Sequence, residues 1–320
     1  MFNTDVIIHE PLYPHVNPLE IEKRLFNTTF LRRLKFLAHF GAGSLVSPVV
    51  HSRYEHTVGV WKLVCFFFPN DKLMRLAAIL HDIGHLPFSH SVEKSLGFDH
   101  HVLTNRYIES NEISTILQEE GVESKDIIQL LNRETVLTGR NGVLGIDHID
   151  SFFRDTYMYG TIDKLPKDII WKLTCTSQGI ETDSETAELI MKLIVSDHKV
   201  FLSPLLLAVD RMLAVAIKLY KEDCQKISGF ALMKDYEVIN LLKKSNSERA
   251  NKIVDLLLNT PSKIVITDKI RNLGIEFGIR KVYAKSPLVN GVLFTETSRA
   301  QKYLRELESL IKNYEVLIDF

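Results

Sequence analysis

Helical periodicity runs through most of the first 225 residues, and it limits the fold more strongly than any other feature of the sequence. Segments with one apolar face alternate with turns rich in Gly, Pro and Asn. These segments lie at 71–80, 98–110, 112–120, 125–134, 145–160 and 203–224. Near the N-terminus, Asn17 as N-cap and Pro18 at the first helical position predict a helix that continues to Gly41. The sequence therefore predicts a mostly α-helical protein.

The pattern changes after about residue 225. A helical segment at 248–259 is followed by short runs of β-branched and aromatic residues at 262–270, 281–286 and 291–296. This change predicts a helical domain over residues 1–225 and a smaller mixed α/β lobe over residues 226–320 that packs on it. No Ser/Gly-rich linker marks the boundary, which therefore rests on the periodicity alone.

Charge and composition exclude several classes of protein. The 320-residue chain has 39 basic and 40 acidic side chains and a net charge of −1, so no bulk field attracts a nucleic acid polymer or an anionic membrane. The most apolar stretch, at 61–68, is too short to span a bilayer, and the N-terminus lacks a signal-peptide pattern, so we expect a cytoplasmic protein. Cys65, Cys175 and Cys224 lack the spacing of a zinc ribbon or a CxxC site, and we expect free thiols.

Histidine is concentrated in one part of the chain. Seven of the 12 histidines fall between His51 and His101, and this clustering indicates a functional site. The isolated histidines His9, His15 and His198 are better explained as surface residues or as rings with local hydrogen bonds. We therefore assign no functional role to these three.

The motif HDIGHLPFSH, at 81–90, places His81 and Asp82 side by side at the end of a predicted helix. Imidazole nitrogens and carboxylate oxygens together suit Fe, Mn, Co, Mg or Zn rather than soft, thiol-seeking ions. Further ligands must come from other helices. The candidates are His56 in SRYEHTVGV and Asp147 in GIDHIDSFFRD, each in a segment that predicts an amphipathic helix.

The order R-x-E-H, then HDIGHxPFSH, then D-x-x-D-x-x-x-RD resembles the HD phosphohydrolase superfamily, particularly its deoxynucleoside triphosphate triphosphohydrolase branch. The resemblance covers roughly residues 20–225 and implies an HD-domain helical bundle core. It implies that the ligands of a divalent metal are His56, His81, Asp82 and Asp147. The remaining coordination positions imply catalysis, and a second ion, Mg, would arrive on the substrate phosphates.

The same resemblance assigns catalytic roles. His90 corresponds to the proton donor of the family, and Glu93, one turn later, can hold its ring. His85 and His100 correspond to phosphate-facing histidines, and Arg53 to an arginine that contacts a phosphate. Arg211 lies where the family keeps another phosphate-contacting arginine, although its spacing to Tyr220 fits imperfectly.

The expected substrate subsite departs from the family pattern. The family reads D-K-x-D-Y where this chain has His148 after Asp147 and Ser151 in place of the tyrosine beside the sugar. His39 stands in place of a glutamine, a His-Glu pair reads His100-His101, and Asp155 is retained to accept a sugar hydroxyl. The expected substrate-binding residues are therefore His39, Arg53, His101, His148, Ser151 and Asp155. These changes favour a nucleotide other than a standard deoxynucleoside triphosphate, and neutral drift explains them equally well.

The leading hypothesis is a metal-dependent phosphohydrolase that releases orthophosphate from a purine (deoxy)nucleotide or nucleotide analogue, a reaction that would suit nucleoside-antibiotic biosynthesis. One alternative is a triphosphohydrolase that attacks the α-phosphorus and releases tripolyphosphate. A second is a metal- or nucleotide-sensing HD domain without turnover, and a third is a helical interaction protein that forms homo-oligomers. A cyclic-dinucleotide phosphodiesterase is disfavoured because no GYP element follows the HDIG sequence.

Overall fold

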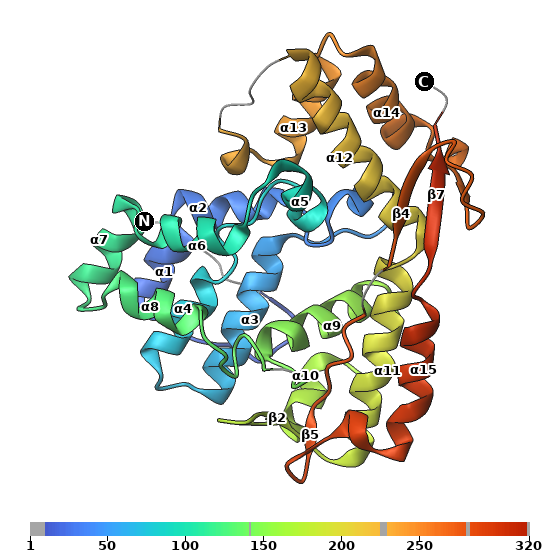
Figure 1. Cartoon of the computed structure of the whole chain (residues 1–320). Helices are drawn as coiled ribbons and strands as arrows, with labels where there is room; N and C mark the ends of the chain where they lie inside the picture. Colours follow the sequence, from blue (N-terminus) through green and yellow to red (C-terminus); the bar gives the residue numbers. More distant parts are fainter. Residues whose placement is uncertain (1–9, 141, 225–228, 280–281, 319–320) are drawn as a thin grey trace.

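The computed structural model describes residues 10–140, 142–224, 229–279 and 282–318. The chain forms a large helical body and, towards the top of Figure 1, a smaller part in which helices and short strands mix. This arrangement confirms the prediction of a mostly α fold with a C-terminal α/β region. The predicted boundary at residues 225 and 226 lies outside the described residues.

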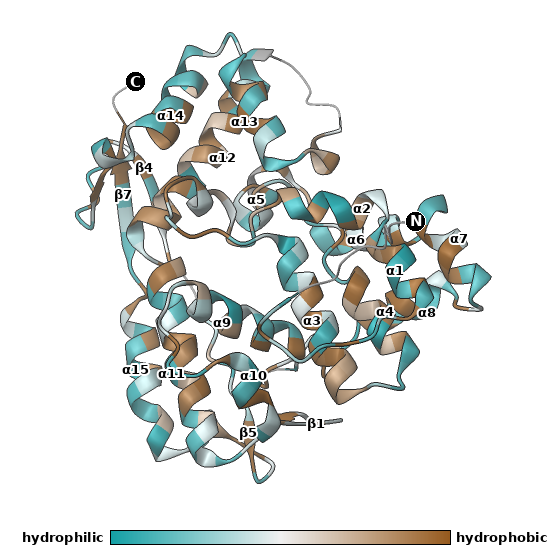
Figure 2. Ribbon diagram, turned by 180° about the vertical axis from the view of Figure 1, so that it is seen from behind, coloured by the Kyte–Doolittle hydropathy of each residue, from teal (hydrophilic) through white to brown (hydrophobic). Residues whose placement is uncertain are grey.

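Helices with one buried face build most of the chain. Those of the helical body are α1 (Glu20–Phe26), α2 (Thr29–Arg33), α3 (Arg53–Phe67), α4 (Lys72–Leu80), α5 (Glu93–Leu96), α6 (His100–Ile108), α7 (Asn111–Glu119), α8 (Ser124–Leu131), α9 (Ile146–Met158), α10 (Pro166–Ile169), α11 (Ser184–Phe201) and α12 (Pro204–Cys224). The C-terminal part adds α13 (Asp235–Lys243), α14 (Glu248–Asn259) and α15 (Gln301–Ser309). Figure 2 shows polar and apolar residues alternating along outer helices such as α7 and α14.

Short 3-10 helices connect these elements. They are η1 (Leu34–Phe36), η2 (Gly41–Leu45), η3 (Ser89–Ser91), η4 (Ile170–Lys172), η5 (Phe230–Leu232), η6 (Pro261–Lys263), η7 (Phe294–Glu296) and η8 (Ser298–Ala300). Two of them, η2 and η3, contact each other although 43 residues of sequence lie between them, and both contact α12. Residues of both 3-10 helices, among them Gly41 and His90, line the candidate site.

Helix α3 lies at the centre of the helical body, where it packs against α4 and α9 (Figure 1). Val60, Trp61 and Leu63 of α3 are fully buried, and the ring of Phe26 meets the Trp61 ring edge-on at a centroid distance of 5.3 Å. Burying side chains of this size stabilises the fold by roughly 1.5–3 kcal/mol each. The sequence predicted an amphipathic helix here, whereas α3 is buried on nearly all sides and is a rigid part of the core.

The N-terminal helix differs from its prediction. It begins after Leu19 rather than after the predicted cap Asn17, because the Glu22 carboxylate accepts a hydrogen bond from the Leu19 backbone at 2.7 Å. Arg75 fixes that carboxylate from α4, with Nε donating to Glu22 Oε1 at 2.7 Å. The predicted single helix is also interrupted before Thr28, which is the N-cap residue of the separate helix α2. The Glu22 carboxylate that marks the start of α1 is thus held by an arginine that is distant in the sequence.

The long helix α11 was not anticipated from the sequence. Asp183 caps its N-terminus by accepting hydrogen bonds from the backbone of Glu185 and Thr186. α11 packs against α9 and α15 and is followed directly by α12. Within the described residues, no single helix has the length and apolar composition needed to cross a bilayer, and α11 with α12 meets that criterion only as a pair bent by 51°.

Two small sheets involve the C-terminal part. The strands β1 (Thr174–Thr176), β2 (Gly179–Glu181), β5 (Leu288–Val289) and β6 (Val292–Leu293) pair in the order β1-β2-β5-β6. The strands β3 (Val265–Thr267), β7 (Asn313–Leu317) and β4 (Ile275–Gly278) pair in that order and are antiparallel. Because β5 pairs with β2, the C-terminal chain returns to the helical body and passes close to α9. Within the predicted strand at 281–286, Ser286 alone of the described residues forms a bridge, with Val143.

Candidate metal centre and active-site cavity

A cavity of about 620 Å³ opens between the end of α4 and helices α3, α6, α9, α11 and α12. Of the site residues predicted from the sequence, all except Glu93 and Arg211 line this one cavity. They are His39, Arg53, His56, His81, Asp82, His85, His90, His100, His101, Asp147, His148, Ser151 and Asp155. The structure thus brings together residues that are spread over more than a hundred positions of the chain.

Four of these side chains converge on one point. His81 is the C-cap residue of α4, as the sequence predicts, and its Nε2 lies 3.4 Å from His56 Nε2 and 3.5 Å from Asp82 Oδ1. Asp147 Oδ1 lies 2.9 Å from His56 Nε2 and 3.8 Å from His81 Nε2. Ligand atoms that share an ion with bonds of about 2.1 Å are separated by similar distances.

The partners of the two imidazoles leave lone pairs for a cation. His56 Nδ1 lies 2.8 Å from Asp150 Oδ2, and His81 Nδ1 lies 2.8 Å from the carbonyl oxygen of Ala78. Each Nδ1 must donate to its oxygen acceptor, so each neutral ring directs the lone pair of Nε2 toward the other ring. Two nitrogen and two carboxylate donors in this arrangement fit a divalent transition ion or Mg²⁺.

Electrostatics at this centre also favours a cation. Although burial disfavours a charged ring, hydrogen bonds with Asp147 and Asp150 raise the pKa of His56 to about 10. Burial opposes ionisation of Asp147, but its hydrogen bond with His56 holds the pKa of this carboxyl below its ordinary value. The carboxylates therefore concentrate negative charge at the centre, and metal binding there would release a proton from His56.

A buried ion pair orients Asp150 behind the centre. Arg154, one turn further along α9, donates to both carboxylate oxygens of Asp150, at 3.0 and 2.9 Å, and also contacts Glu10 at 3.1 Å. Gly59 of α3 permits this arrangement, because a Cβ atom there would lie 2.0 Å from Asp150 Oδ1 and 2.2 Å from Arg154 Nη2. The closeness of α3 and α9 thus depends on a glycine.

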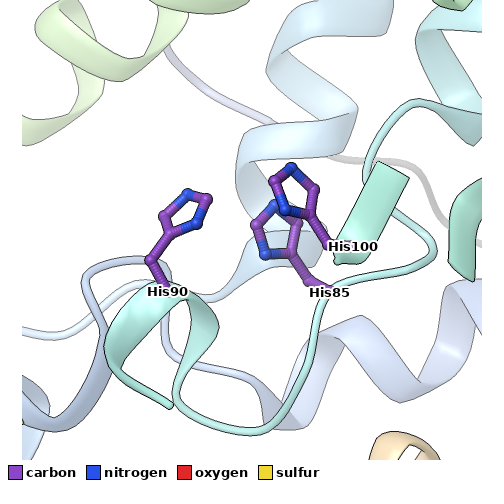
Figure 3. A group of neighbouring side chains, drawn as sticks. All are labelled: His85, His90 and His100. Atoms are coloured by element: carbon purple, nitrogen blue, oxygen red, sulfur yellow. The ribbon is translucent and has the colours of Figure 1, made fainter. Parts of the chain in front are cut away.

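Three imidazoles, those of His85, His90 and His100, surround the adjacent part of the cavity (Figure 3). Each of these rings has a nitrogen within 4.8 Å of a nitrogen on the other two. Figure 3 shows His85 and His100 on one side and His90 facing them from the other, and the first two rings stack at 4.2 Å. Glu93 lies behind the group and contacts Nδ1 of His90 at 2.8 Å and Nδ1 of His100 at 2.7 Å. These hydrogen bonds outweigh burial and lower the pKa of Glu93, which is ionised.

The chain segment before His90 is held in an unusual conformation. Phe88 and Ser89 have φ angles of +57° and +52°, which residues other than glycine rarely adopt. Asp235, at the start of α13, accepts a hydrogen bond from the Phe88 backbone at 2.7 Å and another from Ala38 at 2.7 Å. Burial raises the pKa of Asp235 to about 7. Sequence reasoning missed Asp235, which ties the C-terminal part to the HD motif.

Arg53 lines the cavity, yet its guanidinium is used within the protein. It donates to Asp82 Oδ2 at 2.7 Å, to Ser89 Oγ at 2.9 Å and to the carbonyl of His39 at 3.0 Å. Arg53 therefore positions Asp82 in this structure, and the phosphate contact assigned to it remains a prediction. Arg211 is exposed on α12 and does not line the cavity, so the sequence assignment of a phosphate contact to Arg211 was wrong. The preceding residue, Asp210, faces the cavity instead.

A second polar group lies on the other side of the metal centre. The His39 ring is 4.5 Å from the His56 ring and 4.7 Å from the His51 ring, and Nε2 of His51 hydrogen-bonds to Asp155 Oδ1. Asp197 of α11, which the sequence analysis missed, lines the same part of the cavity. Burial, and then the neighbouring Asp155 carboxylate, raise the pKa of Asp197 well above its ordinary value.

The C-terminal chain reaches the rim of the site. Lys285 Nζ lies 3.1 Å from His148 Nε2, and because a lysine can only donate, His148 accepts with this nitrogen. Burial lowers the pKa of His148, in agreement with a neutral ring. The Tyr283 backbone donates to His198 Nε2 at 3.1 Å, and His198 Nδ1 bonds to the carbonyl of Ile194 at 2.8 Å. The local hydrogen bond predicted for His198 is therefore confirmed, and the ring also lines the cavity.

Two further predicted residues have simple surroundings. The Ser151 hydroxyl donates to the carbonyl of Asp147 at 3.3 Å, and the His101 ring lies 4.0 Å from the His100 ring. His15 is exposed, as expected, with Nε2 3.2 Å from Asn17 Oδ1, and His9 lies outside the described residues. Cys65 and Cys175 are free, as predicted.

Comparisons with known proteins identify related chains. The family model described as "HD domain" matches residues 53–144. The uncharacterized protein YdhJ of Bacillus subtilis is 30% identical over 260 residues, which are 78% of each chain. The deoxynucleoside triphosphate triphosphohydrolase SAMHD1 homolog of Dictyostelium discoideum is 26% identical over 193 residues, 48% of this chain and 36% of that one.

A solved structure supports the fold. The crystal structure of a hypothetical protein from Aquifex aeolicus superposes with a TM-score of 0.69 at 23% identity, over 97% of this chain and 95% of that one. At this identity the likeness concerns the fold alone. The chain spans about half the length of other curated relatives that it matches, 54% in one case and 45% in another.

Proposed function

Because the chain belongs to the HD-domain family, we propose that its cavity hydrolyses phosphate groups of a nucleotide or nucleotide analogue with the help of a divalent metal ion. The name of the slime-mould relative, a deoxynucleoside triphosphate triphosphohydrolase homolog, supports a nucleotide as the substrate class. A nucleotide analogue of the kind made in nucleoside-antibiotic biosynthesis falls within this proposal, since the predicted sugar subsite departs from the family pattern.

The order of chemical groups along the cavity carries this proposal. The His100 ring stacks on His85, and His85 Nε2 lies 3.2 Å from Asp82 Oδ1 of the metal centre. On the other side of the centre, the His56 ring contacts the His39 ring. Beyond His39 the cavity continues to Asp155 and Asp197 and to the apolar rings of Phe40 and Phe201, whose centroids are 5.0 Å apart. Imidazoles, a metal centre, hydroxyl-binding carboxyls and flat apolar rings, in this order, complement phosphate, scissile bond, sugar and base.

Different residues of the cavity would have different roles in hydrolysis. A divalent ion, when bound by His56, His81, Asp82 and Asp147, supplies Lewis acidity to a phosphoryl oxygen and lowers the pKa of a water molecule. Glu93 holds the Nδ1 protons of His90 and His100, which leaves Nε2 of each ring for the substrate. His90 Nε2 would then deliver a proton to the oxygen that leaves, and Glu93 would balance the charge of the ring.

Two registers of the substrate are compatible with this division. In the leading hypothesis the terminal phosphate lies at the metal centre, and orthophosphate is released one unit at a time. The second candidate is hydrolysis at the α-phosphorus with release of tripolyphosphate. The 4.5 Å contact between the His56 and His39 rings favours the second register, because it places the metal centre close to the proposed sugar end.

Product analysis tests the proposal. Purified protein would be incubated with ATP and with dATP in the presence of Mg, Mn or Co, and the products resolved by ion-exchange chromatography and phosphorus NMR. Orthophosphate with di- and monophosphate would support the terminal register, whereas tripolyphosphate with free nucleoside would support the α register. The proposal is wrong if neither product forms with any of the metals.

A further inference from the structure

Two carboxyl groups face each other at the far end of the cavity. Asp155 comes from α9 and Asp197 from α11, and their side chains are only 5% and 10% exposed. His51 Nε2 hydrogen-bonds to Asp155 Oδ1 from the other side. Two carboxylates at contact distance repel each other in a buried site, so such a pair normally shares one proton.

The neighbours of the pair indicate where that proton resides. His51 Nε2 hydrogen-bonds to Asp155, whereas Asp197 lies against Asp155 and has the Nδ1 atom of His198 at 3.4 Å. Burial and the Asp155 carboxylate keep the pKa of Asp197 well above its ordinary value. A proton held at Asp197 lets the pair both donate and accept hydrogen bonds.

Polar atoms at this end of the cavity lack partners within the described protein. Asp197 Oδ1 and His39 Nδ1 are both buried without a hydrogen bond, and both residues line the cavity. Buried polar atoms are seldom left unpaired, because each costs about 1–3 kcal/mol. A ligand with two hydroxyl groups could pair with both atoms, because a hydroxyl group can donate to one atom and accept from another.

Space for such a ligand exists beside Asp147. Ser151 lines the cavity, and its hydroxyl bonds back to the Asp147 carbonyl at 3.3 Å. A small side chain directed to its own helix leaves room for an additional oxygen on the ligand. Asp155, four residues and about one turn further along α9, lies on the same side of the helix.

We infer that Asp155 and Asp197 form a subsite for the vicinal diol of a ribose, so that the substrate is a ribonucleoside phosphate rather than its 2′-deoxy counterpart. This inference rests on the proposed function and specifies its substrate class. Asp155 accepts from one hydroxyl, Asp197 Oδ1 accepts from the other, and His39 Nδ1 completes the set. A 2′-deoxy sugar would leave one of these buried atoms unpaired.

The test compares kcat/KM for ATP and dATP in the wild type and in variants of Asp197. We expect the wild type to prefer ATP about tenfold or more, since one buried hydroxyl contact is at stake. Asp197→Leu should lower kcat/KM for ATP about tenfold and change that for dATP by less than about threefold. Asp197→Asn, which keeps an N–H donor and an oxygen acceptor, should retain most of the preference. Lys192→Ala, on the exposed side of α11, is the matched control.

Equilibrium binding separates failure of this inference from failure of the proposed function. Isothermal titration calorimetry with ADP and dADP in the presence of EDTA, which prevents metal-dependent turnover, measures the sugar preference. Tighter binding of ADP, lost in Asp197→Leu, would support the diol subsite even in a protein that hydrolyses neither nucleotide. Equal or tighter binding of dADP by the wild type, or no binding of either nucleotide, would overturn it, and melting temperatures would show whether each variant is folded.

Discussion

The two ends of the cavity are built in different ways. At the proposed phosphate end, the three histidines that line the cavity and the Glu93 that anchors two of them all come from one short stretch, residues 85–100. At the hydroxyl end, the polar groups come from the segment around His39, from the start of α3, and from α9 and α11. The first end depends mainly on local chain geometry, with a distant hydrogen bond from the Phe88 backbone to Asp235, and the second depends on how distant helices pack.

Because of this difference, substitutions at one end of the cavity can leave the geometry of the other end unchanged. A local motif retains its geometry wherever its helix ends and its Pro-containing turn are retained. The hydroxyl end depends on the relative placement of α9 and α11, so single substitutions there can alter the shape of the sugar subsite while the metal centre remains intact. Catalysis and substrate choice should therefore respond to different sets of variants, and each prediction below probes that separation.

The largest effect is expected at the metal centre. Asp147→Asn removes a charged ligand whose side chain is 34% exposed, so the fold should tolerate the change. The loss of several kcal/mol of charge stabilisation should lower kcat about 10³-fold for ATP and dATP alike, with loss of bound metal. Mass spectrometry of metal content and initial rates would measure both effects. Asp168→Asn, exposed on α10, is the control, and retained metal with a full rate would exclude Asp147 as a ligand.

The next effect concerns proton delivery. The His90 side chain is 62% exposed, so His90→Ala should leave the melting temperature and the metal content unchanged. We expect kcat to fall about 10²-fold for both nucleotides, since a positioned acid contributes at least that factor. Glu93→Gln should have a smaller effect of the same kind, because it weakens the hold on two rings. His15→Ala is the control, because His15 is an exposed histidine that does not line the cavity.

The same variant distinguishes an enzyme from a sensor. A metal- or nucleotide-sensing domain would bind nucleotide equally well with and without His90, and it would have no turnover to lose. An unchanged rate in His90→Ala would remove His90 from the mechanism, and His100 would become the next candidate because Glu93 contacts it in the same way.

The sequence predicts the phosphate end well for physical reasons. Within HDIGHLPFSH the order of residues largely determines which side chains meet, and Glu93 lies one helical turn beyond His90. The structural role of His198 was also predictable, because an isolated histidine on a helix commonly bonds to a carbonyl one turn earlier. In these cases local spacing carries the necessary information.

The residues that the sequence did not predict depend on tertiary contacts. Asp197 has no motif around it, and it acquires its environment only when α11 packs against α9 and brings it to Asp155. Asp235 supports Phe88 from a helix 147 residues away, and neither residue carries a signal of that contact. The buried pair of Glu22 and Arg75 likewise joins two helices that are distant in the sequence. The periodicity of a sequence does not predict contacts between residues that are so far apart in the chain.

A third prediction acts on the hydroxyl end alone. Ser151→Tyr places a ring beside the proposed diol subsite and should lower kcat/KM for ATP about tenfold, through one lost hydrogen bond and reduced space. The value for dATP should change less than about threefold, and kcat with saturating dATP should stay near that of the wild type. Ser151→Ala is the control, because the hydroxyl bonds only to the Asp147 carbonyl. Equal losses for both nucleotides would show that position 151 serves the metal centre instead.

The smallest effect is expected from the residue that belongs to neither end. Lys285 comes from the C-terminal chain and places its charge beside His148, the neighbour of the ligand Asp147. Lys285→Met keeps much of the side-chain length and removes that charge, so KM should rise about threefold for ATP and dATP alike while kcat changes little, as expected for a partly screened contact with phosphate. The increase in KM should shrink at high salt. Lys302→Met, which alters an exposed lysine paired with Glu188, is the control. A changed ratio of ATP to dATP would instead assign Lys285 to the sugar subsite and weaken the separation of the two ends.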